Sequence, residues 1–205
     1  MHCGCEGTGG VSRLARPAAL LAILAGTACG GATSPYLAAA PVLTTKGPDG
    51  TLSETTDLNG DGRPDVFSNY REVEVRKNVN QKILIRKAVD LNGDGRVDLV
   101  TVCDDKGERI REDLDMDFDG RADAVRYYKK GKTEREDLCS QFDGRFDVRK
   151  FYEDGVLVVK QVDTARNGHF DEFQYFSGGK LARVGWDRDG DGKPEAFEEN
   201  PALGE

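Results

Sequence analysis

Six short segments of the sequence place oxygen-bearing side chains at fixed positions around a glycine. They begin at Asp57, Asp90, Asp115, Cys139 and Asp163, and finally at Asp187, at intervals of 33, 25, 24, 24 and 24 residues. Positions 1, 3, 5 and 9 carry mostly Asp or Asn, and position 6 is always glycine, which permits a sharp bend. Calcium takes roughly six to eight hard oxygen ligands. The pattern therefore predicts calcium loops, which we number loops 1 to 6 in chain order.

The predicted Ca²⁺ ligands come from positions 1, 3, 5 and 9, and from the backbone carbonyl of position 7, whose side chain stays free. The last loop adds a glutamate at position 12. The predicted metal residues are Asp57, Asn59, Asp61, Arg63 and Asp65; Asp90, Asn92, Asp94, Arg96 and Asp98; Asp115, Asp117, Asp119, Arg121 and Asp123; Asp163, Asn167 and Asp171; and Asp187, Asp189, Asp191, Lys193, Glu195 and Glu198.

The six loops are unequal in their ligands. Loops 3 and 6 have the richest carboxylate sets, and loop 5 lacks a ligand at Ala165. Loop 4 has a soft thiol at Cys139 and an amide at Gln141, so we expect it to bind calcium poorly or not at all. Its turn shape can still be kept by Asp143 and Asp147. For any single loop, an ordinary Asx-type turn between strands is the alternative.

The segments Asp57-Leu-Asn-Gly-Asp-Gly-Arg-Pro-Asp and Asp90-Leu-Asn-Gly-Asp-Gly-Arg-Val-Asp resemble the calcium loops of FG-GAP/VCBS repeats. They also resemble the first nine positions of an EF-hand loop. The resemblance covers about ten residues per repeat and implies calcium binding at the matching oxygens. Only loop 6 has the EF-hand glutamate, Glu198, and the residues before it do not look helical. A helix-loop-helix pair is therefore disfavoured.

Between the loops the pattern changes to a period of two. Val102, Tyr127, Phe151 and Tyr175 alternate with polar neighbours, as in half-buried strands. Turn residues such as Asp154-Gly155 then separate each first strand from a second one, which is a hairpin signal. We predict an all-β fold of tandem 24-residue β-hairpin repeats forming one twisted or curled antiparallel sheet of about ten strands. Columns of aromatic side chains should stabilise it. Residues 71–81 should lengthen the first hairpin after loop 1.

The N-terminal residues resemble a bacterial lipoprotein signal. Arg13 and Arg16 precede a short apolar run, and small residues then lead to Cys29, the expected lipidation site. Ordinary signal-peptidase cleavage nearby is the alternative. Translation is expected to start at Val11, because residues 1–10 have no signal-like character. We expect a signal peptide over 1–28, a flexible tether over 29–40 and a calcium-loop β-hairpin domain over 41–205.

Composition narrows the possible partners. The net charge is −8, and the first 28 residues carry +1, so the rest carries −9. This acidity argues against binding nucleic acid and favours cations. Cys103 and Cys139 lie at different repeat positions, so a disulfide is not favoured, although it stays open. His169 should face solvent at the free position of loop 5.

We therefore expect an exported, lipid-anchored, calcium-binding repeat protein of the bacterial cell envelope with a structural or interaction role. Its expected partners are calcium ions and the membrane. One alternative is a binding module whose sheet face meets an envelope protein or polysaccharide. The less favoured alternative is an enzyme, because no nucleophile has a plausible histidine partner in the sequence.

Overall fold

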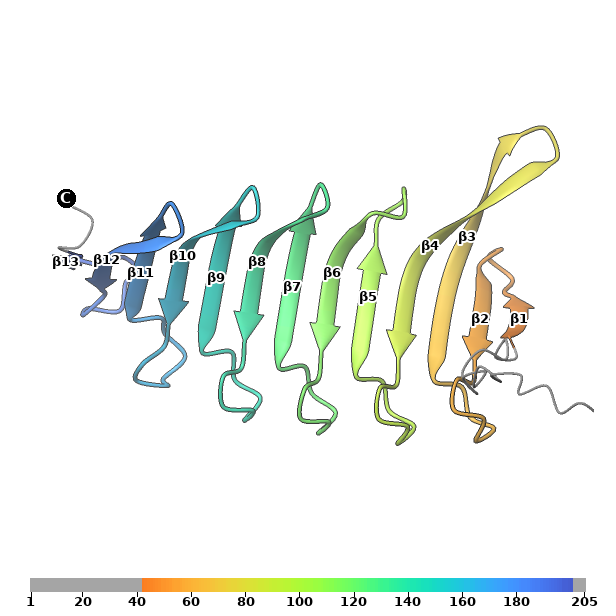
Figure 1. The fold of residues 1–205 in the computed structure, drawn as a ribbon, viewed down its shortest axis with the longest axis horizontal. Coiled ribbons are helices and arrows are strands. Elements are labelled where there is room, and N and C mark those ends of the chain that lie inside the picture. The colour runs from red at the N-terminus through yellow and green to blue at the C-terminus, as the bar shows by residue number, and fades with distance from the viewer. Residues whose placement is uncertain (1–41, 201–205) are drawn as a thin grey trace, which may run out of the picture. The chain divides into compact units, whose positions relative to one another are not determined.

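The computed structural model describes residues 42–200, and the predicted signal peptide, the predicted tether and Cys29 lie outside this range. The described residues belong to the compact unit Ala38–Glu205. They form thirteen strands in one antiparallel sheet whose strand order follows the chain (Figure 1). The strands are β1 (Val42–Lys46), β2 (Leu52–Thr56), β3 (Val66–Arg76), β4 (Val79–Val89), β5 (Leu99–Cys103), β6 (Arg109–Leu114), β7 (Ala124–Lys129), β8 (Lys132–Leu138), β9 (Val148–Glu153), β10 (Val156–Val162), β11 (Glu172–Ser177), β12 (Lys180–Trp186) and β13 (Ala196–Glu199).

The all-β hairpin fold predicted from the sequence is confirmed. The sheet is open rather than closed on itself, and it has thirteen strands rather than about ten. The hairpin of β3 and β4 is the long one, with eleven residues in each strand, as the insertion at residues 71–81 indicated. No helix within residues 42–200 is long and apolar enough to span a membrane.

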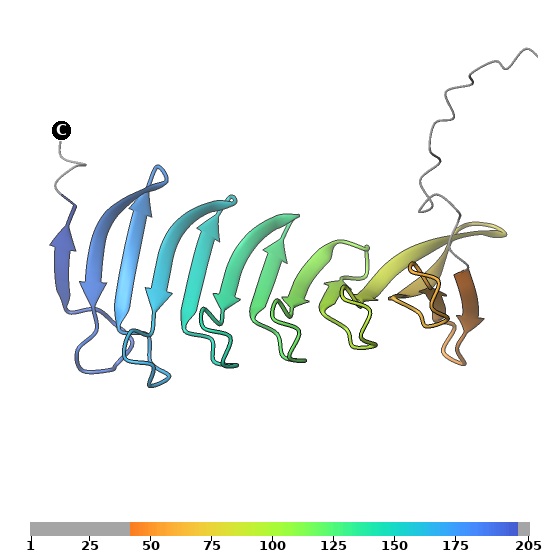
Figure 2. The same cartoon turned by 60° about the horizontal axis from the view of Figure 1, so that its bottom comes forward.

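The six loops lie along one edge of the sheet, and the tight hairpin turns lie along the other (Figures 1 and 2). Loop 1 spans residues 57–65, loop 2 spans 90–98, loop 3 spans 115–123, loop 4 spans 139–147, loop 5 spans 163–171 and loop 6 spans 187–195. The turns use residues that tolerate positive φ, such as Gly131 (φ 76°) and Asp154 (φ 52°). Alternation of loop and turn therefore brings every predicted site to the same edge.

Neighbouring loops are joined by one repeated hydrogen bond. The backbone N–H at position 1 of each loop donates to the carbonyl at position 9 of the loop before it, at 2.7–3.0 Å in all five junctions. Examples are Asp115 to Asp98 and Asp187 to Asp171. The N–H of position 9 in turn donates to the residue that precedes its own loop. The sheet ladder thus continues into the loops and fixes their spacing.

The two faces of the sheet are both mixed, which differs from the expected split into an apolar and a polar face. Tyr127 and Phe151 do not pair directly, because Arg135 lies between them in the register. The guanidinium of Arg135 lies 4.0 Å from the Tyr127 ring centroid, and that of Arg183 lies 4.6 Å from the Tyr175 centroid. Since the described residues form a single layer, stacked guanidinium groups cover the rings where a second sheet would otherwise do so.

The opposite face carries a ladder of ion pairs. Glu136 accepts hydrogen bonds from Arg126 at 2.7 Å and from Lys150 at 3.0 Å, on the strands to either side. Glu112 accepts from Arg109 at 2.6 Å and from the Tyr128 hydroxyl at 2.5 Å. Opposite charges directly across antiparallel strands stabilise the pairing.

Carboxylates outnumber hydrocarbon side chains in the buried part of the described residues. Seven apolar residues are buried, against eleven polar ones, of which ten are Asp or Glu. Eight of those ten are the Asp residues at position 1 or 9 of a loop. Because a buried charge is costly unless it is hydrogen-bonded or paired, the stability of this sheet depends on how its loops satisfy their carboxylates.

Candidate metal centre

The loops share one pattern of internal hydrogen bonds. Where position 1 is Asp, its carboxylate accepts the N–H of the position-6 glycine at 2.7–2.9 Å. Position 5 accepts the N–H of position 7 in all six loops. Position 9 accepts the N–H of position 2 in all six. A metal loop and a plain Asx turn both contain such bonds, so they define the loop's shape and not its chemistry.

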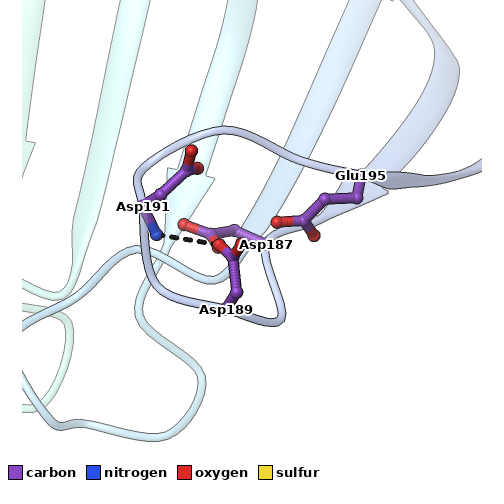
Figure 3. A group of neighbouring side chains, drawn as sticks. All are labelled: Asp187, Asp189, Asp191 and Glu195. Carbon is purple, nitrogen blue, oxygen red and sulfur yellow. Dashed lines mark hydrogen bonds between the residues drawn. The ribbon is translucent and has the colours of Figure 1, made fainter.

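Two loops bring several acidic side chains together. In loop 6, ligand oxygens of Asp187, Asp189, Asp191 and Glu195 all lie within 4.8 Å of one another (Figure 3). In loop 3, those of Asp115, Asp117 and Asp123 do the same. Two oxygens that each bind one calcium ion at about 2.4 Å can be at most about 4.8 Å apart. These are the two loops that the sequence marked as richest, and both groups can hold a metal ion.

Each acidic group combines a buried aspartate at the end of a strand with an exposed aspartate two residues later in the loop. Asp187 and Asp115 are buried at the ends of β12 and β6, while Asp189 and Asp117 are exposed. The N–H of Asp191 donates to Asp189 at 3.1 Å, which turns the Asp189 carboxylate into the loop (Figure 3). Glu198 lies on β13, outside the loop 6 group, and Asp119 lies outside the loop 3 group.

The electrostatics of both groups favour an added positive charge. Loss of hydration raises the pKa of Asp117, and the charges of Asp119 and Asp123 raise it further, against the lowering effect of the Asp119 N–H. The N–H of Asp191 lowers the pKa of Asp189, but a hydrogen bond shared with Glu195, loss of hydration and nearby negative charge raise it overall. Loss of hydration and like charge together hold both carboxylates back from ionising, and a cation relieves the repulsion between them and their acidic neighbours.

Loops 1 and 2 place an amide where loops 3 and 6 have a carboxylate. The amide nitrogen of Asn59 lies 3.2 Å from Asp65 and 3.4 Å from Asp61, and that of Asn92 lies 3.3 Å from Asp94. These amides separate the acidic groups. Loop 2 nevertheless keeps one unsatisfied atom: Oδ1 of Asp98, a residue only 2% exposed, has no hydrogen-bond partner among the described residues. A cation in loop 2 would satisfy it.

Loops 4 and 5 depart most from the pattern. In loop 5 the hydroxyl of Thr164 donates to Asp171 at 2.7 Å, and Asp163 and Asp171 are the only acidic residues. Cys139 in loop 4 is 1% exposed, and Cys103 and Cys139 are both free thiols. Loop 4 keeps its turn through Asp143 and Asp147, as expected. His169 is exposed, also as expected.

The position-7 arginines of loops 1, 2 and 3 reach toward the next loop, and Arg121 also forms an ion pair with Asp119 in its own loop at 3.9 Å. A Cβ at Gly95 would lie 3.9 Å from Nη1 of Arg63, and one at Gly144 would lie 3.1 Å from Nη1 of Arg121. These side chains were expected to be free of the metal site, which agrees with their outward direction, whereas their contact with the next loop has no signal in the sequence.

Arg166 has a role that is not apparent from the sequence. This residue occupies position 4 of loop 5, and its guanidinium donates to Gln141 Oε1 and to Asp143 Oδ2 in loop 4. The pKa of Asp143 is lowered, first by the N–H of Arg145 and further by the thiol of Cys139 and the charge of Arg166, against the effect of burial. This is opposite to the direction found for Asp117 and Asp189. No signal in the sequence links residues that lie 23 to 25 positions apart in different loops.

The fold and the site define an open antiparallel β-sheet of sequential hairpins with acidic clusters that can hold metal ions. No protein-family model matches the sequence, and the comparison with curated proteins gives no match. Among solved structures, the chain is similar to accessory secretory protein 1,2 and 3 in Streptococcus pneumoniae, with 11% identity and a TM-score of 0.23. That similarity covers 61% of this chain and 19% of the other, and a likeness this weak carries no argument about function.

Proposed function

We propose that this chain is a calcium-binding protein of the bacterial cell envelope whose ions stabilise the loop edge of its sheet. The observation that carries the proposal is the convergence of acidic oxygens in loops 3 and 6. The donors are all carboxylate oxygens, which suit a hard cation such as Ca²⁺ and not a thiol-seeking metal. Asp98 in loop 2 adds a buried oxygen that lacks a donor among the described residues.

The ions would neutralise the negative charge of the carboxylates that the fold buries at the two ends of each loop. The position-1 and position-9 residues sit where strands enter and leave each loop, and most of them are buried. A ligand that binds only the folded state stabilises it by mass action. Calcium would therefore strengthen the junctions between hairpins, which suits a structural or interaction role outside the cytoplasm, where millimolar calcium matches sites of modest affinity.

We further propose that the chain is exported and held at the membrane by lipid on Cys29, and that it has no catalytic role. The anchor is supported by the basic residues, the short apolar run and the small residues that precede Cys29. The absence of catalysis is supported by the repeat, because the clustered acids already have loop positions that account for them.

The calcium proposal is tested by following backbone amide resonances during a calcium titration of the protein. The position-6 amides of Gly120 and Gly192 donate to Asp115 and Asp187, so binding in loops 3 and 6 should shift them along saturable curves. Gly144 in loop 4 is the internal control and should not move. If all six glycine amides drift together without saturation, calcium acts only as a general counter-ion and the proposal is wrong.

A further inference from the structure

Loop 4 keeps the loop geometry although it lacks the usual acids at positions 1 and 3. Ser140 N–H donates to Asp147 at 2.7 Å, Arg145 N–H donates to Asp143 at 3.1 Å, and Asp147 N–H donates to Leu138 at 3.0 Å. The same three bonds close the loops that gather carboxylates. Loop 4 therefore has the shape of a metal loop, with a thiol and an amide in place of two of the ligands.

The guanidinium of Arg166 contacts the two loop 4 residues that correspond to ligand positions 3 and 5. It donates from Nη1 to Gln141 and from Nη2 to Asp143, and it forms an ion pair with Asp143. In loop 6 the residues at these two positions, Asp189 and Asp191, belong to the acidic group that can hold a metal. A planar guanidinium with several donors can satisfy two oxygens at once and brings a permanent positive charge.

The backbone at Arg166 has the left-handed conformation that position 4 adopts in all six loops. Arg166 has φ +57°, in the left-handed region. Position 4 is glycine in loops 1, 2 and 6, at Gly60, Gly93 and Gly190, and phenylalanine in loops 3 and 4, at Phe118 and Phe142. Glycine adopts this conformation without strain, whereas a long side chain does not. The arginine lies in a strained position from which it reaches the neighbouring loop.

We propose that the guanidinium of Arg166 takes the place of a metal ion in loop 4 and so holds loops 4 and 5 together without calcium. We call this contact of Arg166 with Gln141 and Asp143 the clamp. Loop 5 contributes to this independence, because the Thr164 hydroxyl already binds Asp171 and Ala165 removes a ligand. Loops 4 and 5, which lie between β8 and β11, would then stay joined whether or not calcium is present, and loops 3 and 6 lie on either side of them. The calcium response of loops 3 and 6 rests on the proposed function, whereas the contact of Arg166 with loop 4 does not depend on it.

The clamp is tested first without any calcium. Hydrogen exchange is measured in chelator for the wild-type protein, Arg166→Gly and Arg166→Lys. The glycine variant restores the residue of loops 1, 2 and 6, so it removes the guanidinium without adding strain. We expect the amides of Ser140 and Arg145 to exchange roughly three- to tenfold faster in Arg166→Gly, with partial protection in Arg166→Lys.

Arg145→Ala is the matched control. Arg145 lies in the same loop and its charge also acts on Asp143, but its side chain makes no hydrogen bond or ion pair within the described residues. Its replacement should leave exchange at Ser140 unchanged. If Arg166→Gly exchanges at the wild-type rate, or if Arg145→Ala accelerates exchange equally, the guanidinium does not close loop 4 and the clamp is wrong.

The second test asks whether the guanidinium stands where an ion would bind. The triple variant Cys139→Asp, Gln141→Asp and Arg166→Gly gives loop 4 the acidic positions of loop 3. Native mass spectrometry should show one more bound calcium ion than in the wild-type protein. The double variant that keeps Arg166 should show no gain. No additional ion in a folded triple variant would contradict the inference. A wild-type protein that binds no calcium but shows the exchange result would overturn only the proposed function.

Discussion

Replacing Asp191 by asparagine removes one negative charge from the ligand set of loop 6 while preserving the local turn. Oδ1 of Asp191 accepts the N–H of Lys193 at 2.8 Å. Asn167 has the equivalent position in loop 5, and its Oδ1 accepts the N–H of His169 at 2.9 Å. The chain itself therefore shows that asparagine supports this turn. Asp191→Asn should fold normally and lose calcium affinity in loop 6.

The expected magnitude follows from mass action. At millimolar calcium, a site with a dissociation constant of about 10⁻⁴–10⁻³ M stabilises the fold by about 0.4–1.4 kcal/mol. For a domain of roughly 150–250 residues, this corresponds to about 1–6 °C in Tm. The wild-type protein, with loops 3 and 6, should gain about twice this amount. Asp191→Asn should lose one site's share.

The assay is thermal unfolding in chelator and in millimolar calcium, with the difference in Tm as the readout. Asp154→Asn is the matched control, because Asp154 lies in a hairpin turn at the other edge, where its side chain is 92% exposed and pairs with Lys132. Its difference in Tm should equal the wild-type value. A wild-type transition that chelator leaves unmoved, or equal calcium effects in Asp191→Asn and the wild-type protein, would refute the reasoning.

Three further predictions concern the ladders and the anchor. Burial raises the pKa of Glu136, but hydrogen bonds from Arg126 and Lys150 lower it overall. The stability that Glu136 contributes to the fold is therefore complete above the unfolded-state pKa of about 4.3 and is lost as the pH falls through the lower folded-state pKa. The free energy of unfolding, measured with urea in chelator, should thus depend less on acid pH in Glu136→Gln than in the wild-type protein. An unchanged pH profile would count against this ladder. Arg135 stacks on Tyr127 and pairs with the buried Asp137 at 3.0 Å, so Arg135→Ala should cost on the order of 1–3 kcal/mol in urea unfolding, and a change near zero would contradict that role. Mass spectrometry of membrane-fraction protein should find an acylated Cys29, and Cys29→Ser should release the chain; a soluble product unaffected by that substitution would exclude the anchor.

The loops and hairpins were predictable because their signals are local. Glycine at position 6 and acids two residues apart mark a loop within a few residues of sequence. Alternation of side chains marks a strand in the same way, and β6, β8, β10 and β12 each end at the residue before a predicted loop. The ranking of loops 3 and 6 also held, because ligand number depends on residue types within one loop.

The arrangement across strands was less predictable. A β-bulge shifts the register in several hairpins, for example between Tyr127 and Tyr128 and between Tyr175 and Phe176. Such shifts decide which side chains become neighbours, and they placed arginines between the expected aromatic columns. Whether the sheet curls depends on twist accumulated over many strands. The contact of Arg166 with loop 4 depends on the spacing between loops, which no local pattern encodes.

The central claim is tested most directly by counting bound ions. The full chain is placed in equilibrium dialysis against a buffer whose free calcium is about ten times the expected dissociation constant of about 10⁻⁴–10⁻³ M and whose excess monovalent salt screens weakly held counter-ions, and the calcium on the two sides of the membrane is measured by elemental mass spectrometry. The account predicts about two ions per chain, with one lost in Asp191→Asn and none lost in Asp154→Asn. No excess of calcium on the side that holds the wild-type protein would show that the loops are ordinary turns and would contradict the account.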